Sequence, residues 1–226
     1  MTVLFEYPKG ATFGKALSKT KIYKHAKADT RIQKLFVEQV DRIVWQYKLA
    51  PETINLDSTN TVTEIQILNL HLRTSKYSDE VLRTIDKAIS FPIIFELLHS
   101  GKIKTVAAYK RPSESDKTKW VVSEYLNGEW KSEDSSRKPL PPALDLGGLY
   151  DRIFAVLIPD GIADGESTEI RIKRVELIRL KRRDARRIRA RLAREKQFNK
   201  QVAINAELRK VTEELKRLGD DVLAEE

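Results

Sequence analysis

The residues best able to do chemistry are a dense run of arginine and lysine in the last third of the chain. Between Arg171 and Lys200 there are 14 basic residues and three acids, a local net charge of +11 in a chain whose total is +9. Side chains at this density can neutralise nucleic-acid phosphates without reading a base sequence. The candidate nucleic-acid-binding residues are Arg179, Lys181, Arg182, Arg183, Arg186, Arg187, Arg189, Arg191 and Arg194.

Two further roles for the basic run stay open. Its charges could pair with acids of a partner protein or of a second copy, or they could form an ordinary solvated helix face. No aromatic residues interleave the run, so base stacking of the single-strand-binding type is not predicted. Sequence-independent contact with phosphates is therefore the first hypothesis.

Acidic residues support a rival hypothesis, a Mg²⁺-dependent nuclease. Such sites combine one acid with an acid-x-Lys triplet that holds the metal and orients water. Asp116 followed by Glu129-Trp-Lys131 has this spacing. However, Asn127-Gly128 predicts a tight turn immediately before the triplet, where few further metal ligands would be within reach. A second possible acidic cluster for such a site lies near strand and helix ends and consists of Glu64, Asp86 and Glu96.

Composition and motifs argue against several other classes of protein. The chain has no cysteine, and its three histidines lie in unrelated contexts, so neither a disulfide framework nor a cysteine–histidine metal site is predicted. There is no Walker loop, nucleotide-binding glycine pattern or Ser-His-Asp set, and we expect no cofactor and no metal. The sequence has no secretory or transit peptide and no membrane-spanning apolar run. A cytoplasmic protein is therefore expected.

These residues must be positioned by a folded domain, and residues 1–158 have an α+β pattern. A helix capped by Asp29 or Thr30 is predicted to continue to Ala50, and Val62–Leu72 is predicted to be a strand. Ser78 should cap a second helix. Antiparallel strands follow, including a hairpin across Ser100-Gly101, and then a short helix at residues 149–158. We therefore expect an antiparallel sheet covered by helices.

A hinge and a long helix complete the predicted order. Residues 159–165 contain two glycines and a proline, which predicts a hinge, and residues 166–218 contain neither residue type, which predicts one long basic helix before a tail at 219–226. Apolar residues near the end of this helix alternate by four and three, the pattern of a coiled coil over about two heptads. The residues expected to mediate assembly are Ile204, Leu208, Val211, Leu215 and Leu218.

The chain resembles an uncharacterised bacterial and archaeal family, the domain-of-unknown-function 4391 family. The segments that carry the resemblance are Ile43–Asn55, Glu64–Ile67, Ile85–Phe95, Ala108–Lys110 and Glu195–Leu208. The family has no established activity to transfer to these residues. Its members tend to be encoded beside helicase and DNA-methyltransferase genes in restriction-like or phage-defence clusters, so the resemblance implies an accessory role that concerns DNA.

These observations predict a non-enzymatic accessory subunit of a DNA-modification or phage-defence system. It would bind nucleic acid, DNA rather than RNA, through the basic helix and assemble through the coiled-coil end. The expected protein partners are a helicase or methyltransferase subunit or a second copy of the chain, and no membrane. The alternatives are an assembly adaptor that does not contact nucleic acid and, second, the Mg²⁺-dependent nuclease.

Overall fold

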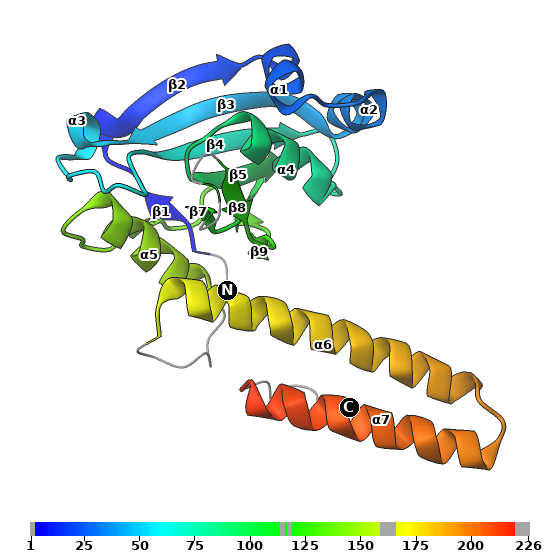
Figure 1. Cartoon of the computed structure of the whole chain (residues 1–226). Helices are drawn as coiled ribbons and strands as arrows, with labels where there is room; N and C mark the ends of the chain where they lie inside the picture. Colours follow the sequence, from blue (N-terminus) through cyan, green and yellow to red (C-terminus); the bar gives the residue numbers. More distant parts are fainter. Residues whose placement is uncertain (1–2, 114–115, 117–118, 159–165, 220–226) are drawn as a thin grey trace. The chain divides into compact units, whose positions relative to one another are not determined.

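The computed structural model describes residues 3–113, 116, 119–158 and 166–219, and the chain forms two compact units (Figure 1). The first unit comprises Met1–Leu157 and the second Ile158–Glu226. The predicted hinge at residues 159–165 lies outside the described residues, as does the tail beyond Gly219. Each unit is therefore described separately.

In the described residues, the first unit contains a seven-stranded mixed sheet with strand order β10-β6-β5-β4-β3-β2, and β9 also pairs with β6. The strands are β2 (Thr12–Leu17), β3 (Val40–Leu49), β4 (Ile65–Leu72), β5 (Ile93–His99), β6 (Lys102–Ala107), β9 (Leu126–Asn127) and β10 (Lys131–Ser132). Two smaller sheets pair β1 (Phe5–Glu6) with β11 (Lys138–Pro139) and β7 (Lys110–Pro112) with β8 (Trp120–Val122). The α+β class is confirmed.

The expectation of a purely antiparallel sheet is wrong, because β4 and β5 are parallel. Helix α4 (Asp79–Ala88) connects them, as a parallel pair requires a crossover rather than a tight turn. Ser78 caps α4 as predicted, since its hydroxyl accepts a hydrogen bond from the Glu80 amide. The central strand β4 is buried on both faces, with Ile67 and Leu68 fully inaccessible to solvent. This double burial accounts for its nearly continuous apolar sequence.

Three helices supply one side of the main hydrophobic core. They are α1 (Lys19–Ala26), α2 (Thr30–Gln39) and α4, which contribute Ile22, Phe36 and Ile85 to a cluster with the sheet residues Leu70 and Phe95. The Asp29 carboxylate caps α2 by accepting a hydrogen bond from the Ile32 amide at 2.8 Å. The remaining helical elements of this unit are the 3₁₀ turn η1 (Lys9–Ala11), α3 (Pro51–Ile54) and α5 (Leu146–Leu157).

The helix predicted to continue to Ala50 ends at Gln39, and Val40–Leu49 is instead strand β3. This segment pairs with β2 on one side and β4 on the other, so backbone pairing decides its conformation. Its register against β4 shifts between Val40 and Arg42 and again between Trp45 and Tyr47. Each bulge moves side chains to the other face, and this hides the two-residue period that identifies a strand.

The predicted turn at Asn127-Gly128 is also wrong. Asn127 pairs with Val106 and Lys131 with Ile103, so the chain continues past Gly128 along the same side of β6. The Gly128 amide donates to the Thr105 carbonyl at 3.0 Å. Five residues of the chain, 127–131, run beside four of β6, 103–106, which is the signature of a bulge rather than a hairpin. Pairing with a long neighbouring strand has overridden the local turn preference.

The second unit is a hairpin of two antiparallel helices, α6 (Thr168–Arg194) and α7 (Phe198–Arg217), which lie side by side in Figure 1. A long C-terminal helix is therefore present, but the single helix expected over residues 166–218 is interrupted. The break needs neither glycine nor proline. The Glu195 carboxylate accepts hydrogen bonds from the Lys196 and Gln197 amides, both at 2.9 Å, and the Gln201 side chain donates to the Glu195 carbonyl at 2.7 Å. These bonds satisfy backbone groups at the turn.

Candidate nucleic-acid interface

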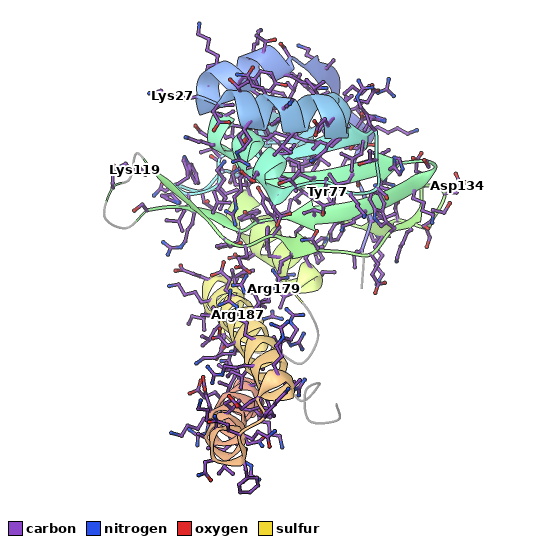
Figure 2. The ribbon with its side chains drawn as sticks, turned by 90° about the vertical axis from the view of Figure 1, so that its right-hand side faces the viewer. Lys27, Tyr77, Lys119, Asp134, Arg179 and Arg187 are labelled. Carbon is purple, nitrogen blue, oxygen red and sulfur yellow. The ribbon has the colours of Figure 1, made fainter. Side chains whose placement is uncertain are left out.

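The apolar residues of α6 and α7 position the basic side chains by fixing which way each helix faces. Ala185 and Ile188 of α6 are buried, as are Ile204 and Leu215 of α7. Contact between the two helices buries this inner surface, so the charged positions of α6 are distributed over its sides and outer face. Figure 2 shows the side chains of this hairpin, with Arg179 and Arg187 labelled on α6.

The predicted assembly residues of α7 lie on or beside its inner surface. Ile204 and Leu215 are buried, while Leu208, Val211 and Leu218 are partly buried. These apolar residues, spaced alternately by four and three, therefore pack at least in part against α6 of the same chain. Assembly with a second chain through these residues stays a prediction.

Several of the predicted nucleic-acid-binding side chains already have partners within the chain. Lys181 forms an ion pair with Glu214, and Arg191 forms one with Glu207, both across the hairpin. Arg179, Arg182 and Arg183 also interact with other groups of the chain. These five residues would have to exchange an existing contact for a phosphate, which reduces the free energy gained from binding.

The other four predicted residues are available for an external anion. Arg186, Arg187, Arg189 and Arg194 make no ion pair with any residue that the structure describes, and all except the partly buried Arg189 are exposed. Arg187, Arg191 and Arg194 also line one shallow hollow of about 380 Å³, together with Ala190 and Glu195. Their spacing of four and three residues places these three guanidinium groups on one side of the helix. Arginine presents several donors in a fork that fits phosphate oxygens.

The residues of the nuclease hypothesis lie in different parts of the first unit. Asp116 lies between β7 and β8, where it forms an ion pair with Lys119 at 3.1 Å. Glu129 and Lys131 belong to the segment that runs along β6. Within the described ranges, no group of three or more His, Cys, Asp or Glu side chains is arranged to hold a metal ion.

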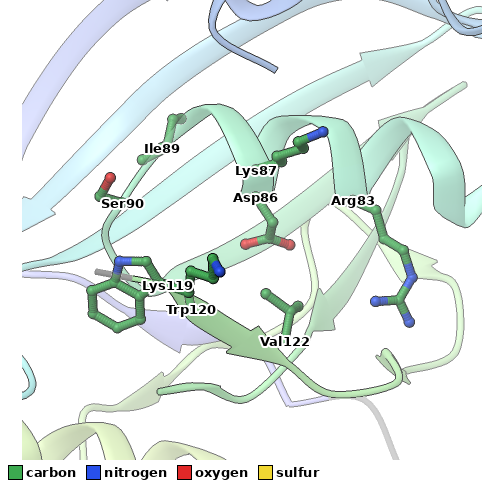
Figure 3. Close-up of a pocket in the computed structure, with 8 residues that line it drawn as sticks. All are labelled: Arg83, Asp86, Lys87, Ile89, Ser90, Lys119, Trp120 and Val122. Carbon is green, nitrogen blue, oxygen red and sulfur yellow. The ribbon is translucent and has the colours of Figure 1, made fainter. Parts of the chain in front are cut away.

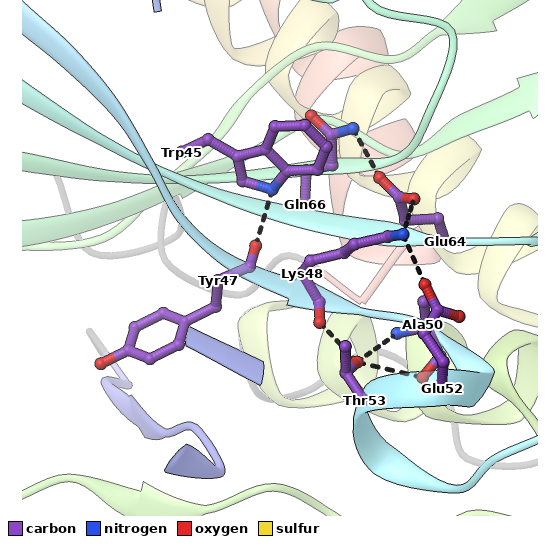
Figure 4. Close-up of polar contacts among 8 residues, drawn as sticks. All are labelled: Trp45, Tyr47, Lys48, Ala50, Glu52, Thr53, Glu64 and Gln66. Carbon is purple, nitrogen blue, oxygen red and sulfur yellow. Dashed lines mark hydrogen bonds and ion pairs between the residues drawn. The ribbon is translucent and has the colours of Figure 1, made fainter. Parts of the chain in front are cut away.

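The second acidic set forms three separate ion pairs, each with a buried carboxylate, instead of one cluster. Glu96 receives two hydrogen bonds from Arg137, at 2.7 and 3.1 Å. Glu64 accepts a hydrogen bond from the Gln66 side chain at 2.6 Å and lies 3.4 Å from Lys48 (Figure 4). Lys48 also pairs with the exposed Glu52 at 2.5 Å. Each buried carboxylate thus has its own cation, as burial of charge requires.

The third acid, Asp86, belongs to a buried polar cluster that the sequence patterns do not identify. The Lys110 ammonium lies 3.7 Å from the Asp86 carboxylate, and the Tyr125 hydroxyl donates to the same carboxylate. Burial raises the pKa of Asp86 to about 6, although Lys110 and Tyr125 oppose the shift. Burial also lowers the pKa of Lys110. The available signal is that Lys110 directly follows the apolar segment 106–109 and begins β7, but its acidic partner is 24 residues away.

The chain thus combines an α+β domain with a helical hairpin rich in arginine and lysine, and a family model matches the sequence of both parts. Residues 5–215 match the model described as Domain of unknown function (DUF4391), and the chain belongs to that family. The match extends over both units. No curated protein and no solved structure matches the chain. Among the residues described by the structure, no helix is both long and apolar enough to cross a membrane.

Proposed function

We propose that this chain binds nucleic acid through the arginines of α6, as a non-enzymatic accessory subunit of a DNA-modification or phage-defence system. The observation that supports binding is the set of four arginines without an ion pair among the described residues, Arg186, Arg187, Arg189 and Arg194. The accessory role is proposed from what the resemblance to this family implies, a tendency of its members to be encoded beside helicase and methyltransferase genes, because the family itself has no known function.

The geometry suits contact with a phosphate backbone. From Arg186 to Arg194 the helix rises about 12 Å, which spans three to four base-pair steps of duplex DNA. Arginines on different sides of one helix can contact neighbouring phosphates without inserting into a groove. Helix α6, all of which the structure describes, contains no aromatic residue, so binding through base stacking is not proposed. We expect recognition that is independent of sequence, with DNA preferred to RNA.

The number of available arginines sets the expected salt dependence. Each phosphate neutralised on duplex DNA contributes about −0.9 to the slope of log affinity against log salt. Four contacts therefore give a slope of about −3.6. The five residues with partners inside the chain would add little, since each must first release its own partner.

The test is a titration of the full chain with a short DNA duplex over a series of salt concentrations. The variant Arg186→Gln/Arg187→Gln/Arg194→Gln should bind weakly, with a slope reduced to about −0.9. The matched control is Lys200→Gln/Arg209→Gln/Lys210→Gln, which removes the same charge from exposed positions of α7. The control should keep the original slope. Equal losses in both variants, or no binding by the unaltered chain at low salt, would overturn the proposal.

The adaptor alternative has one observation in its favour. Phe198 and Val202, four residues apart on α7, are 75% and 53% exposed. Such a pair forms a small apolar surface that a second copy of the chain could cover. Sedimentation analysis tests this alternative: self-association that is independent of salt and is abolished in Phe198→Ser/Val202→Ser supports it. A monomer at all concentrations excludes self-association through this pair.

A further inference from the structure

The first unit contains a cavity that the nucleic-acid hypothesis does not use. It has a volume of about 560 Å³ and lies between the end of α4, the residues after it, and strand β8 (Figure 3). Its lining combines cationic, acidic and apolar side chains, namely Arg83, Asp86, Lys87, Ile89, Ser90, Lys119, Trp120 and Val122. A cavity of this size is within the range of small-molecule sites, roughly 300–1,000 Å³.

The Asp86 carboxylate forms the innermost polar group of this cavity. Asp86 is 3% exposed, and Figure 3 shows its carboxylate directed from α4 toward β8. Tyr125 donates a hydrogen bond to Oδ2, and Lys110 Nζ lies 3.7 Å from Oδ1. A carboxylate has about four acceptor positions, so Asp86 can still accept hydrogen bonds from a ligand. Tyr125 and Lys110 hold the Asp86 carboxylate in one orientation, which fixes the direction of any hydrogen bond from a ligand.

Lys110 positions this acid and does not itself face a ligand. Its ammonium donates to the Asp86 carbonyl at 2.6 Å and to the Ile89 carbonyl, and it lies near Asp86 Oδ1. The two carbonyls take two of its three donors, the Asp86 carboxylate is held by charge at 3.7 Å, and Nζ also lies 5.7 Å from the centre of the Trp120 ring. The lysine thereby ties the end of α4 to β7 and holds the cavity floor in place. A buried ion pair of this kind is weak evidence for stability.

The mouth of the cavity is cationic, and one wall is aromatic. Arg83 and Lys87 are exposed on α4, one turn apart, and Arg83 also donates to the Ser123 carbonyl at 3.3 Å. Lys119 is exposed beside Trp120, where it forms its ion pair with Asp116. Lys87 makes no ion pair with any residue that the structure describes. Trp120 and Val122 supply the apolar surface. A complementary ligand therefore has an anionic group, a planar ring that can stack on an indole, and N–H donors for a carboxylate.

We propose that this cavity binds a nucleoside monophosphate, with the base against Trp120, its N–H groups donating to Asp86, and the phosphate near Lys87 and Arg83. Guanine fits best, because its adjacent N1–H and N2–H groups can donate to both oxygens of one carboxylate. The ligand is either a free nucleotide or the terminal nucleotide of a strand, since both present the same groups. This site is separate from the α6 arginines, so the two proposals can fail independently.

The first experiment is calorimetric titration of the full chain with GMP, guanosine and inorganic phosphate. GMP should bind, guanosine should bind more weakly, and phosphate alone should not bind measurably. Trp120→Ala should weaken GMP binding about tenfold, as expected for the loss of one stacked base. Lys87→Gln should weaken it about fivefold, as expected for one ion pair at an exposed lysine. The control Lys34→Gln, at an exposed position on α2, should leave affinity unchanged.

Trp120 and Lys87 are not part of the buried ion pair, so both variants should fold. Asp86→Asn adds a specificity test: it should reduce GMP binding more than UMP binding, since uracil offers a single N–H donor. Failure of GMP to bind the unaltered chain, or unchanged affinity in both Trp120→Ala and Lys87→Gln, overturns the proposal.

A second titration separates the two sources of the nucleotide. The probe is a short single strand that carries a 5′-phosphorylated guanosine, added to the Arg186→Gln/Arg187→Gln/Arg194→Gln variant so that α6 binding does not interfere. If the strand binds and GMP displaces it, the cavity takes a strand end. If GMP binds but the strand does not compete, the cavity takes the free nucleotide. Strand binding that GMP cannot displace and Trp120→Ala does not weaken contradicts the proposal.

Discussion

Lys110 Nζ lies 3.7 Å from Asp86 Oδ1, and the two side chains are 1% and 2% exposed. Burial is the largest influence on both pKa values, since it raises that of Asp86 and lowers that of Lys110. Both shifts disfavour the charged forms, so the attraction between the two groups does not compensate fully for their loss of water. The ionised pair therefore costs stability at neutral pH.

The pH dependence of stability follows from the direction of the Asp86 shift. Its pKa is about 6 in the folded chain and about 3.9 for an unperturbed aspartate. Because folding raises this pKa, the contribution of Asp86 to the unfolding free energy is fully present below about pH 3.9 and is lost as pH rises through about 6. The loss is about 3 kcal/mol.

Urea unfolding of the unaltered chain and of Asp86→Asn, repeated across this pH range, measures the effect. The difference in unfolding free energy, unaltered minus variant, should fall by about 3 kcal/mol from about pH 3 to about pH 8. Asp134→Asn, at an exposed position, is the control and should give a difference that hardly depends on pH. A pH-independent difference for Asp86→Asn would show that the carboxylate titrates normally in the folded chain.

The pair between Arg137 and Glu96 gives a second stability prediction. Glu96 on β5 is 1% exposed and receives two hydrogen bonds from Arg137, which also donates to the Phe5 carbonyl at 2.8 Å. Arg137→Met leaves a buried carboxylate without its cation and should lower the unfolding free energy by about 3 kcal/mol. Adding Glu96→Gln should restore part of this loss, because the remaining buried group is then neutral.

Denaturant titration of both single variants and the double variant gives the coupling between these two residues. Arg152→Met serves as the control, since Arg152 is exposed on α5 and its replacement should change stability little. If the double variant is no more stable than Arg137→Met alone, the loss comes from the Phe5 hydrogen bond or from packing, and not from an unpaired charge.

The elements that the sequence predicts well are those with local signals. The cap residues Asp29 and Ser78 mark the starts of α2 and α4, and each makes the expected hydrogen bond to a backbone amide. The Ser100-Gly101 turn between β5 and β6 is also predictable, because a two-residue loop between apolar runs requires positive φ angles that glycine adopts easily. In these three cases the residues that determine the local structure lie within a few positions of one another in the sequence.

The elements that the sequence does not predict depend on contacts between distant segments. Helical periodicity continues through Val40–Leu49, but pairing with β2 and β4 makes this segment a strand. Glu195 ends α6 with a hydrogen-bonded turn that has no glycine or proline to reveal it. The basic run is recognisable from composition alone. Which of its members pair within the chain depends on where α7 places Glu207 and Glu214.

Two glycines should respond in opposite ways to replacement by alanine. Gly101 has a φ of +70° and follows Ser100 with a φ of 48°, so Gly101→Ala should destabilise the chain by about 1 kcal/mol. Gly148 lies in α5, and a Cβ there would contact its nearest neighbour at an ordinary 3.4 Å. Gly148→Ala should stabilise the chain by about 0.5–1 kcal/mol. Thermal unfolding of the two variants checks both signs, and a loss of stability at Gly148 would show that the helix has no room for the methyl group.

The intramolecular pairs of the hairpin should limit binding to nucleic acid, and removing one acid tests this. Glu207 on α7 pairs with Arg191, which lines the same hollow as Arg187 and Arg194. Glu207→Gln releases this arginine, so the slope of log affinity against log salt for a DNA duplex should become steeper by about 0.9. Glu213→Gln makes the same change in net charge at an exposed position nearby and should leave the slope unchanged. Equal slopes in the two variants would mean that binding responds to total charge, and that the surface formed by Arg187, Arg191 and Arg194 is not where DNA binds.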